Sequence, residues 1–276
     1  LHHIIIPSSV TNLGKSVLYG CESLLSATIN APIDVLGDAS IESPDGFFEG
    51  CILLEMVDLP NTLKTIGRET FRDCISLEKI TLPDSLRILQ LRAFMDCTSL
   101  KSVTLSGELP LDDSNPFEGC SGITLEFSER SETIIGSNNH FDTLGGAVVA
   151  VSIPSNARSI GENAFYNWSN LKTVRMENGL ETIKDFAFFG TAIENIIIPD
   201  TVSTLGYFAF GACRNLTEIT IRGNIEIEND VITGSYDVNL IISEGTKEIL
   251  SSIRVFGDYV NRINNPSTVD TLTDTL

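Results

Sequence analysis

Cysteine is the residue type in this sequence with the widest chemistry, because a thiolate can act as a nucleophile, a metal ligand or a disulfide partner. The six cysteines are Cys21, Cys51, Cys74, Cys97, Cys120 and Cys213. In an extracellular chain an even number would allow three disulfides. However, all six occupy one position of a repeat, and parallel side chains in such a column rarely reach the dihedral angle of a disulfide. We therefore predict free thiols that point into the core.

The neighbours of the cysteines argue against their other uses. Between Cys120 and Cys213 the same repeat position holds Leu144, Trp168 and Thr191, so Cys213 has no cysteine within reach. No histidine or Cys-x-x-Cys pair accompanies the cysteines, and a zinc cluster is therefore not expected.

The other candidates for chemistry are three histidines and one acidic run. His2, His3 and His140 have no acidic partner at a spacing that predicts a catalytic triad or a zinc site. The run Asp-Asp-Ser-Asn at 112–115 could bind calcium, but it lacks the spaced ligands of an EF-hand or RTX loop, and the alternative is a solvated loop. The sequence therefore predicts no catalytic, cofactor-binding or metal-binding residue and no enzyme. An enzyme would need a pocket with converging titratable groups.

A repeat of roughly 23 residues positions these side chains. Its clearest units are residues 59–80 and 82–103. One position recurs as Phe48, Phe71, Phe94, Phe117, Phe141, Phe165, Phe188 and Phe210, with Leu18 and Ile232 in the same place at the ends. The cysteine position follows it, and an Ile-Gly or Leu-Gly pair precedes it. A unit this short cannot bury its own apolar face, so each coil must be covered by its neighbours.

Each unit closes with a segment in which apolar and polar residues alternate, which is typical of a half-buried strand. The expected inward residues are Ala27 and Ile29, Val57 and Leu59, Ile80 and Leu82, Val103 and Leu105, Leu125 and Phe127, Val151 and Ile153, Val174 and Met176, Ile196 and Ile198, Ile219 and Ile221, and Leu240 and Ile242. Stacked coils place these strands in a parallel sheet. The A-F-x-x-C stretch is too short for a stable helix and predicts a helical turn or 3₁₀ corner. The glycine after Ile or Leu suits a bend with positive φ.

We therefore predict a leucine-rich-repeat-like solenoid of about ten coils. It is expected to be right-handed, with a parallel β-sheet on one side and short turns, 3₁₀ or helical corners opposite. The solenoid should span residues 1–250, and residues 251–276 should form a C-terminal cap and polar tail. An insertion after Gly37 predicts an exposed loop in one coil, and the acidic run at 112–115 predicts an irregular wall in another.

The formal net charge of −19 limits the possible partners. It repels phosphate, so we expect no nucleic-acid partner and no attraction to anionic membranes. No apolar run approaches the ~20 residues of a membrane span, so we expect no membrane insertion. The sequence starts on what reads as the end of a repeat strand, and we expect a secretion signal or earlier repeats before Leu1. We expect a monomer.

The repeats resemble the BspA-like leucine-rich repeat family, whose units read L-P-x-x-L-x-x-I-G-x-x-A-F-x-x-C-x-x-L-x-x-I. The match covers about residues 4–242 and is among the closest in LPNTLKTIGRETFRDCISLEKI at 59–80. Members of this family are typically secreted or displayed on the surfaces of anaerobic bacteria and some parasitic protists, where binding of host proteins or other cells is attributed to them. The resemblance implies a secreted or cell-surface, adhesin-like binding protein, and it brings no catalytic motif.

The outward residues of the predicted strands define the surface on which we expect a partner. They are Ser26, Thr28, Met56, Asp58, Lys79, Thr81, Ser102, Thr104, Thr124, Glu126, Ala150, Ser152, Thr173, Arg175, Asn195, Ile197, Glu218, Thr220, Asn239 and Ile241. This face is flat, rich in Ser and Thr and without aromatic anchors, so a merely solvated sheet is the alternative. We place the site for a protein or glycan ligand near Lys79, Thr81, Arg175 and Glu218. The alternative function is a structural spacer that displays another domain of a larger surface protein.

Overall fold

The computed structural model of the chain describes residues 1–37, 46–106, 115–134, 146–223, 225–227, 230–242 and 260–264. These residues form twenty strands joined by turns, and they contain no helix. In this part of the chain there is accordingly no helix that could cross a membrane. The chain divides into two compact units, one made of Leu1–Ser131 and Asn139–Ala150 and the other of Glu132–Asn138 and Val151–Leu276.

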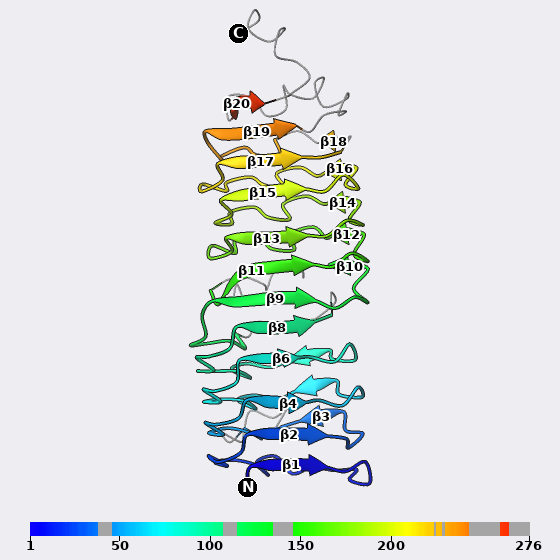
Figure 1. Ribbon diagram of the computed structural model, residues 1–276, viewed down its shortest axis with the longest axis vertical. Coiled ribbons are helices and arrows are strands. Elements are labelled where there is room, and N and C mark those ends of the chain that lie inside the picture. The colour runs from blue at the N-terminus through cyan, green and yellow to red at the C-terminus, as the bar shows by residue number, and fades with distance from the viewer. Residues whose placement is uncertain are drawn as a thin grey trace, which may run out of the picture. The chain divides into compact units, whose positions relative to one another are not determined.

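In the first unit the closing segments of the repeats form parallel strands, as predicted. They are β1 (His3–Ile6), β2 (Ser26–Ile29), β4 (Met56–Asp58), β6 (Lys79–Thr81), β8 (Ser102–Leu105) and β9 (Ile123–Phe127). β1, β2 and β4 pair in one ladder, and β6, β8 and β9 pair in another. The pairing joins equivalent repeat positions, so that Ile4 lies opposite Ala27 and Ile80 opposite Val103. Figure 1 shows these strands as arrows that point the same way.

The second unit repeats this arrangement. Its long strands are β13 (Thr173–Met176), β15 (Asn195–Ile198), β17 (Glu218–Ile221), β19 (Val238–Ile242) and β20 (Val260–Asn264), and β11 (Val148–Ile153) contributes residues to both units. β15, β17, β19 and β20 pair in this order, all parallel. Within the segment predicted to be a cap and tail, residues 260–264 therefore extend the sheet, and the remaining residues lie outside the described part.

The burial of the strand side chains follows the alternation of the sequence. Every predicted inward residue is buried except Leu59, Val174 and Met176, which are half-buried. Every predicted outward residue is exposed or half-buried. The two faces of the strands are thus assigned correctly, because a period of two leaves no other way to bury the apolar set.

A second ladder, which we did not predict, runs through the Ile-Gly and Leu-Gly positions. Its two-residue strands are β3 (Val35–Leu36), β5 (Thr65–Ile66) and β7 (Ile88–Leu89) in the first unit, and β10 (Thr133–Ile134), β12 (Ser159–Ile160), β14 (Thr182–Ile183), β16 (Thr204–Leu205) and β18 (Glu226–Ile227) in the second. All pair in parallel with the equivalent strand of the neighbouring coil.

The predicted bend with positive φ at the glycines of this ladder is wrong for most of them. Positive φ occurs at Gly37 (82°) but at none of Gly14, Gly67, Gly161 and Gly206. The Gly206 amide instead donates to the Ile183 carbonyl at 2.8 Å and continues the ladder. A Cβ on Gly206 would lie 2.6 Å from the Lys184 carbonyl carbon. Close approach of two coils, rather than positive φ, therefore excludes a side chain there.

The corner around each Phe of the repeat column is a stacked turn, so the predicted helical or 3₁₀ corner is wrong. Glu69 (φ 53°) and Asp73 (φ 58°), two residues on either side of Phe71, are left-handed. Such residues interrupt a right-handed helical path within one turn. The corner amides bond to the next coil instead: Phe71 donates to the Ala93 carbonyl at 2.7 Å and Asp73 to the Met95 carbonyl at 2.9 Å. The corner is thus a third ladder between coils.

The Phe column fills the core behind this corner. The ring centroids of Phe48, Phe71, Phe94 and Phe117 follow one another at 5.2, 4.9 and 5.4 Å, and those of Phe165, Phe188 and Phe210 at 5.1 and 5.3 Å. These separations follow the spacing of about 4.8 Å between paired strands. All seven rings are buried, which confirms the predicted core position, whereas Phe141 lies outside the described residues.

Candidate functional site

The cysteine column lies three residues after the Phe column, and all six thiols are free, as predicted. Five are buried and Cys21 is half-buried. Each buried thiol donates a hydrogen bond of 3.0–3.3 Å to a carbonyl of the preceding coil: Cys51 to Leu18, Cys74 to Phe48, Cys97 to Phe71, Cys120 to Phe94 and Cys213 to Phe188. Ser235, at the same repeat position, makes this bond to Phe210 at 2.9 Å. Where this position holds a buried cysteine or Ser235, its side chain therefore joins two neighbouring coils.

Burial makes these thiols poor nucleophiles. It raises the pKa of Cys51 from 9.0 to about 12, and the pKa values of Cys120 and Cys213 to about 11. Burial also raises the pKa values of Cys74 and Cys97 well above 9.0. Because the thiolate is the reactive form, the column provides packing and hydrogen bonds rather than chemistry.

The other residues considered for chemistry do not form a site where the structure describes them. The described residues contain no group of three His, Cys, Asp or Glu suited to a metal ion. The Nδ1 atom of His3 lies 2.8 Å from the Ser26 hydroxyl, at an exposed position. His140 and residues 112–114 of the acidic run lie outside the described residues, and the side-chain oxygen of Asn115 accepts the Phe117 amide at 3.1 Å.

Two of the predicted partner-binding residues, Lys79 and Thr81, lie together in a groove of the first unit. Both belong to β6, and both are exposed. The groove has a volume of about 390 Å³, and its other lining residues are Met56, Val57, Asp58, Leu59, Asn61, Ile80 and Pro83. Of these lining residues Val57 and Ile80 are buried, whereas Met56 and Asp58 of β4 are exposed, as are Lys79 and Thr81 of β6.

The groove lies where the ladder of long strands is interrupted. β4 pairs with β2, and β6 pairs with β8, but β4 and β6 belong to different sheets. The edges that β4 and β6 turn toward each other therefore carry backbone groups that no strand pairing uses. Leu59, which the sequence predicts to be buried, is half-buried at this point. The interruption opens the sheet face locally.

The side chains of the groove offer several kinds of contact. Lys79 forms no ion pair with any described residue. The Met56 side chain is 49% exposed. The Asp58 carboxylate accepts a hydrogen bond from the Thr28 hydroxyl at 3.2 Å, which fixes its position. A cation, a thioether, a carboxylate and a hydroxyl are suited to binding a polar partner, and they include no nucleophile beside a base.

Arg175 and Glu218 lie in the second unit and are not brought together. Arg175 is exposed on β13. Glu218 is half-buried on β17, between Asn195 of β15 and Asn239 of β19. No described hydrogen bond or ion pair joins Arg175 to Glu218.

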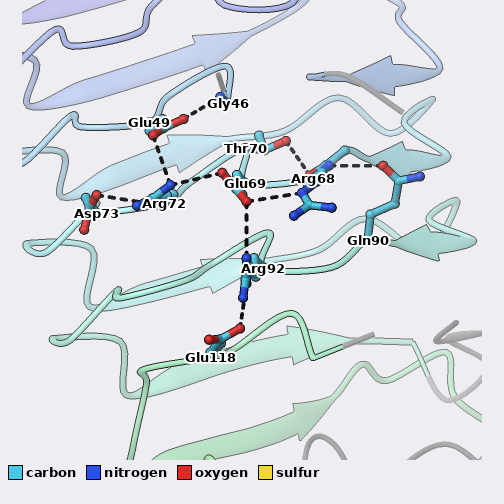
Figure 2. Close-up of polar contacts among 11 residues, drawn as sticks. Gly46, Glu49, Arg68, Glu69, Thr70, Arg72, Asp73, Gln90, Arg92 and Glu118 are labelled. Carbon is cyan, nitrogen blue, oxygen red and sulfur yellow. Dashed lines mark hydrogen bonds and ion pairs between the residues drawn. The ribbon is translucent and has the colours of Figure 1, made fainter. Parts of the chain in front are cut away.

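An ion-pair network on the corners of the first unit was not predicted from the sequence (Figure 2). Glu69 is only 5% exposed. Its carboxylate lies 3.2 Å from Arg68, 3.2 Å from Arg72 and 4.0 Å from Arg92. The network extends to Glu49, Asp73 and Glu118. Both carboxylate oxygens of Glu69 are therefore occupied by cations, and the residue is suited to joining coils rather than to acting as a base.

Two repeat positions carry five of the seven residues of this network, and their pattern could have revealed part of it. Glu49, Arg72 and Glu118 each follow the Phe of their coil, and Glu69 and Arg92 each precede it by two residues. Opposite charges at one position of neighbouring coils predict a pair across the coils, as they do across paired strands. In the second unit the same two positions carry Tyr166, Phe189, Phe186 and Phe208, which we also did not single out from the sequence.

Comparisons with known proteins agree with the repeat architecture. The family described as BspA type Leucine rich repeat region matches in six copies, over residues 1–46, 41–143 and 133–259. No curated protein matches the sequence.

Several solved bacterial proteins are similar to the chain. A leucine-rich repeat protein from Bacteroides ovatus is 24% identical over 95% of this chain and 68% of its own, with a TM-score of 0.48. A leucine rich cell surface protein from Faecalibacterium prausnitzii is 19% identical over 97% and 89%, with a TM-score of 0.33. The pneumococcal vaccine antigen PcpA is 16% identical over 95% and 67%, with a TM-score of 0.39.

Proposed function

The chain belongs to the BspA-type leucine-rich repeat family, and we propose that it is a secreted or cell-surface protein. In this proposal it binds a macromolecular partner through its strand face and has no catalytic activity. The partner is a protein or glycan of a host or another bacterium, as the family resemblance implies. The surface location and the adhesin-like role both belong to this proposal.

The groove between β4 and β6 is the observation that carries the proposal. It is the place on the strand face of the first unit where the ladder is interrupted and backbone edges are available to a partner. Lys79 and Thr81 flank these edges with a charge and a hydroxyl. Tight binding also needs apolar contact, and the exposed Met56 side chain supplies it.

Arg175 of the second unit is the other cation that we assign to partner binding. It is exposed on β13 and forms no ion pair with a described residue. An exposed arginine is a frequent anchor in interfaces because its guanidinium both donates several hydrogen bonds and stacks. Glu218, on β17, adds a carboxylate to the strand face of the same unit.

A screen of protein and glycan arrays with the purified chain tests the proposal. For a ligand found in this way, Lys79→Glu and Arg175→Glu should each weaken binding, together by about tenfold or more. Lys64→Glu is the matched control, because it reverses the same charge at a residue next to β5. The ion pair of Lys64 with Asp34 is exposed to solvent. It should leave the affinity within about twofold, since an exposed pair contributes little.

Three outcomes would contradict parts of this proposal. If binding survives both charge reversals but is lost on deletion of residues 38–46, the site lies away from Lys79 and Arg175. A hydrolytic activity that one point substitution abolishes would contradict the non-catalytic role itself. A screen in which no ligand is retained would favour the spacer over the binding protein.

A further inference from the structure

Five aromatic side chains form a continuous cluster on the corners of three coils in the second unit. They are Tyr166, Phe186, Phe189, Tyr207 and Phe208, and together they are called the aromatic patch below. The stacked pairs are Tyr166 with Phe189, at 5.1 Å between ring centroids, and Phe186 with Phe208, at 5.5 Å. Edge contacts of 4.3–6.4 Å complete the cluster.

The aromatic patch is separate from the Phe column of the core. Tyr207 is 39% exposed, and the other four rings are half-buried, whereas the rings of the core column are buried. Gly211 leaves the space that these rings occupy: a Cβ there would lie 2.6 Å from Cδ1 of Phe208 and 2.9 Å from Cδ2 of Phe189. The patch therefore presents ring surface to solvent on a closely packed support.

Two residues of the aromatic patch have a backbone conformation that is unfavourable for their residue type. Phe186 (φ 55°) and Phe208 (φ 52°) are left-handed, a conformation that Asn and Asp tolerate and that bulky residues seldom adopt. The equivalent positions of the neighbouring coils are Asn163 and Asp230, which fit it. The fold thus holds phenylalanine where asparagine would be less strained, and such strain is typical of functional positions.

The charges around the aromatic patch are mainly negative. Exposed Asp185 and Lys184 directly precede Phe186, exposed Glu162 precedes Asn163, whose amide donates to the Asp185 carbonyl at 3.1 Å, and half-buried Asp230 has the repeat position of Phe208 in the next coil. Asp185 is fixed at the rim, because one of its oxygens accepts the Tyr207 amide at 2.9 Å. Among the residues described in this unit, none of the three carboxylates forms an ion pair. The whole chain, at −19, adds a field that attracts cations.

We propose that the aromatic patch is a second binding site, which takes an arginine-containing, positively charged segment of a partner protein. A planar guanidinium stacks on the faces of tyrosine and phenylalanine rings and still donates hydrogen bonds to carboxylates. Glu162, Asp185 and Asp230 supply those carboxylates around the rings. An anionic ligand is disfavoured by the same charges, and an uncharged glycan gains nothing from them.

Short capped peptides test this site directly. The probe is a peptide with two arginines in a Gly/Ser background, and the comparison peptides carry lysine or citrulline at the same positions. Citrulline keeps the planar shape and removes the charge. Calorimetry or NMR titration at moderate salt should give affinities in the order arginine, lysine, citrulline, with about fivefold or more between the first and last.

The variant Phe186→Asn combined with Phe208→Asn removes two rings without changing the charge. Asparagine already stands at this position in Asn163, so the variant should keep the left-handed corner, and circular dichroism checks that it folds. We expect its affinity for the arginine peptide to fall about fivefold or more. Tyr19→Asn is the control, because Tyr19 is an exposed aromatic residue of the first unit at the repeat position of Tyr166. It should bind as the wild type does.

A measurement on the unaltered protein keeps the proposal independent of any variant. Aromatic NMR resonances of Tyr166 and Tyr207 should shift on addition of the arginine peptide, and that of Tyr19 should not. Equal affinity of the wild type and the double variant would mean attraction to the net charge alone and would overturn the site. Binding of an uncharged oligosaccharide in place of the arginine peptide would overturn the assigned partner.

Discussion

The rings of Phe71 and Phe94 lie 4.9 Å apart between centroids and within 1° of parallel, and both are fully buried. They belong to neighbouring coils, whose backbones are joined by the bond from the Phe71 amide to the Ala93 carbonyl at 2.7 Å. The side-chain stack and the backbone ladder therefore have a common spacing, and a change in one ring affects the coils on both sides.

Replacement of Phe71 by alanine should lower the free energy of unfolding by about 3–5 kcal/mol, because it removes buried apolar area and leaves a cavity between two rings. Urea denaturation followed by circular dichroism measures this loss. Tyr19→Ala, at an exposed position, should change stability by about 0.5 kcal/mol or less. A loss below about 1 kcal/mol for Phe71→Ala would show that the coils close over the missing ring.

The hydrogen bond from the Cys97 thiol to the Phe71 carbonyl at 3.0 Å predicts an order among substitutions. Cys97→Ser should destabilise the protein less than Cys97→Ala, because serine keeps a donor for that carbonyl, as Ser235 does in its own coil. The expected difference is about 1 kcal/mol in urea denaturation. If alanine is the milder change, the bond is not what selects the residue type in this column.

Titration of thiols in the denatured, unreduced protein should find close to six reactive groups. In the native protein only the half-buried Cys21 should react quickly, because the other five thiols are buried. Denatured protein without reactive thiols would contradict the free column, since disulfides would then be present.

Stability should fall with rising pH above about 9, for a reason that lies in the same column. The folded state holds the pKa of Cys120 at about 11, so between about 9 and 11 the unfolded chain loses this proton while the folded chain keeps it. The free energy of unfolding keeps its full value below pH 9 and decreases between pH 9 and 11. The decrease from this one thiol is about 1 kcal/mol at pH 10. Comparison of the wild type with Cys120→Ser isolates this effect from the titration of lysine and tyrosine. Equal slopes for the two proteins would contradict the raised pKa.

Glu69→Ala should destabilise the first unit by about 1–3 kcal/mol, because it leaves Arg68, Arg72 and Arg92 without their shared carboxylate. The loss is smaller than for a fully buried pair because the three arginine side chains are about one-third exposed to solvent. Thermal unfolding with and without 1 M salt measures the loss. A variant as stable as the wild type would show that the arginines find water or other carboxylates at no cost.

The strands and the core could be predicted from the sequence, whereas the corners could not. Alternating residues such as Ile80 and Thr81 permit only one assignment of faces, and the spacing of Phe71 and Phe94 requires stacked coils. The corner depends on left-handed residues such as Glu69 and Phe186. Neither glutamate nor phenylalanine favours that conformation, so the residue type does not predict it. The corner ladder and the aromatic patch follow from this conformation, whereas the opposite charges of Glu69 and Arg92 at one repeat position indicate part of the ion-pair network.

The candidate site was predicted only in part. Lys79 was chosen as an outward strand residue, and its exposure was confirmed. The interruption between β4 and β6 arises from pairing between coils, which the sequence of either strand does not encode by itself. Arg175 and Glu218 were grouped because both face outward, and a shared face does not bring side chains into contact.

Hydrogen–deuterium exchange with a bound partner tests the strand-face proposal most directly. In the free protein the amides on the facing edges of β4 and β6 should exchange faster than those of β8, which is paired on both sides. Addition of a ligand found by the array screen should slow exchange in Met56–Asp58 and Lys79–Thr81. Protection confined to other segments, with these two strands unchanged, would contradict the account.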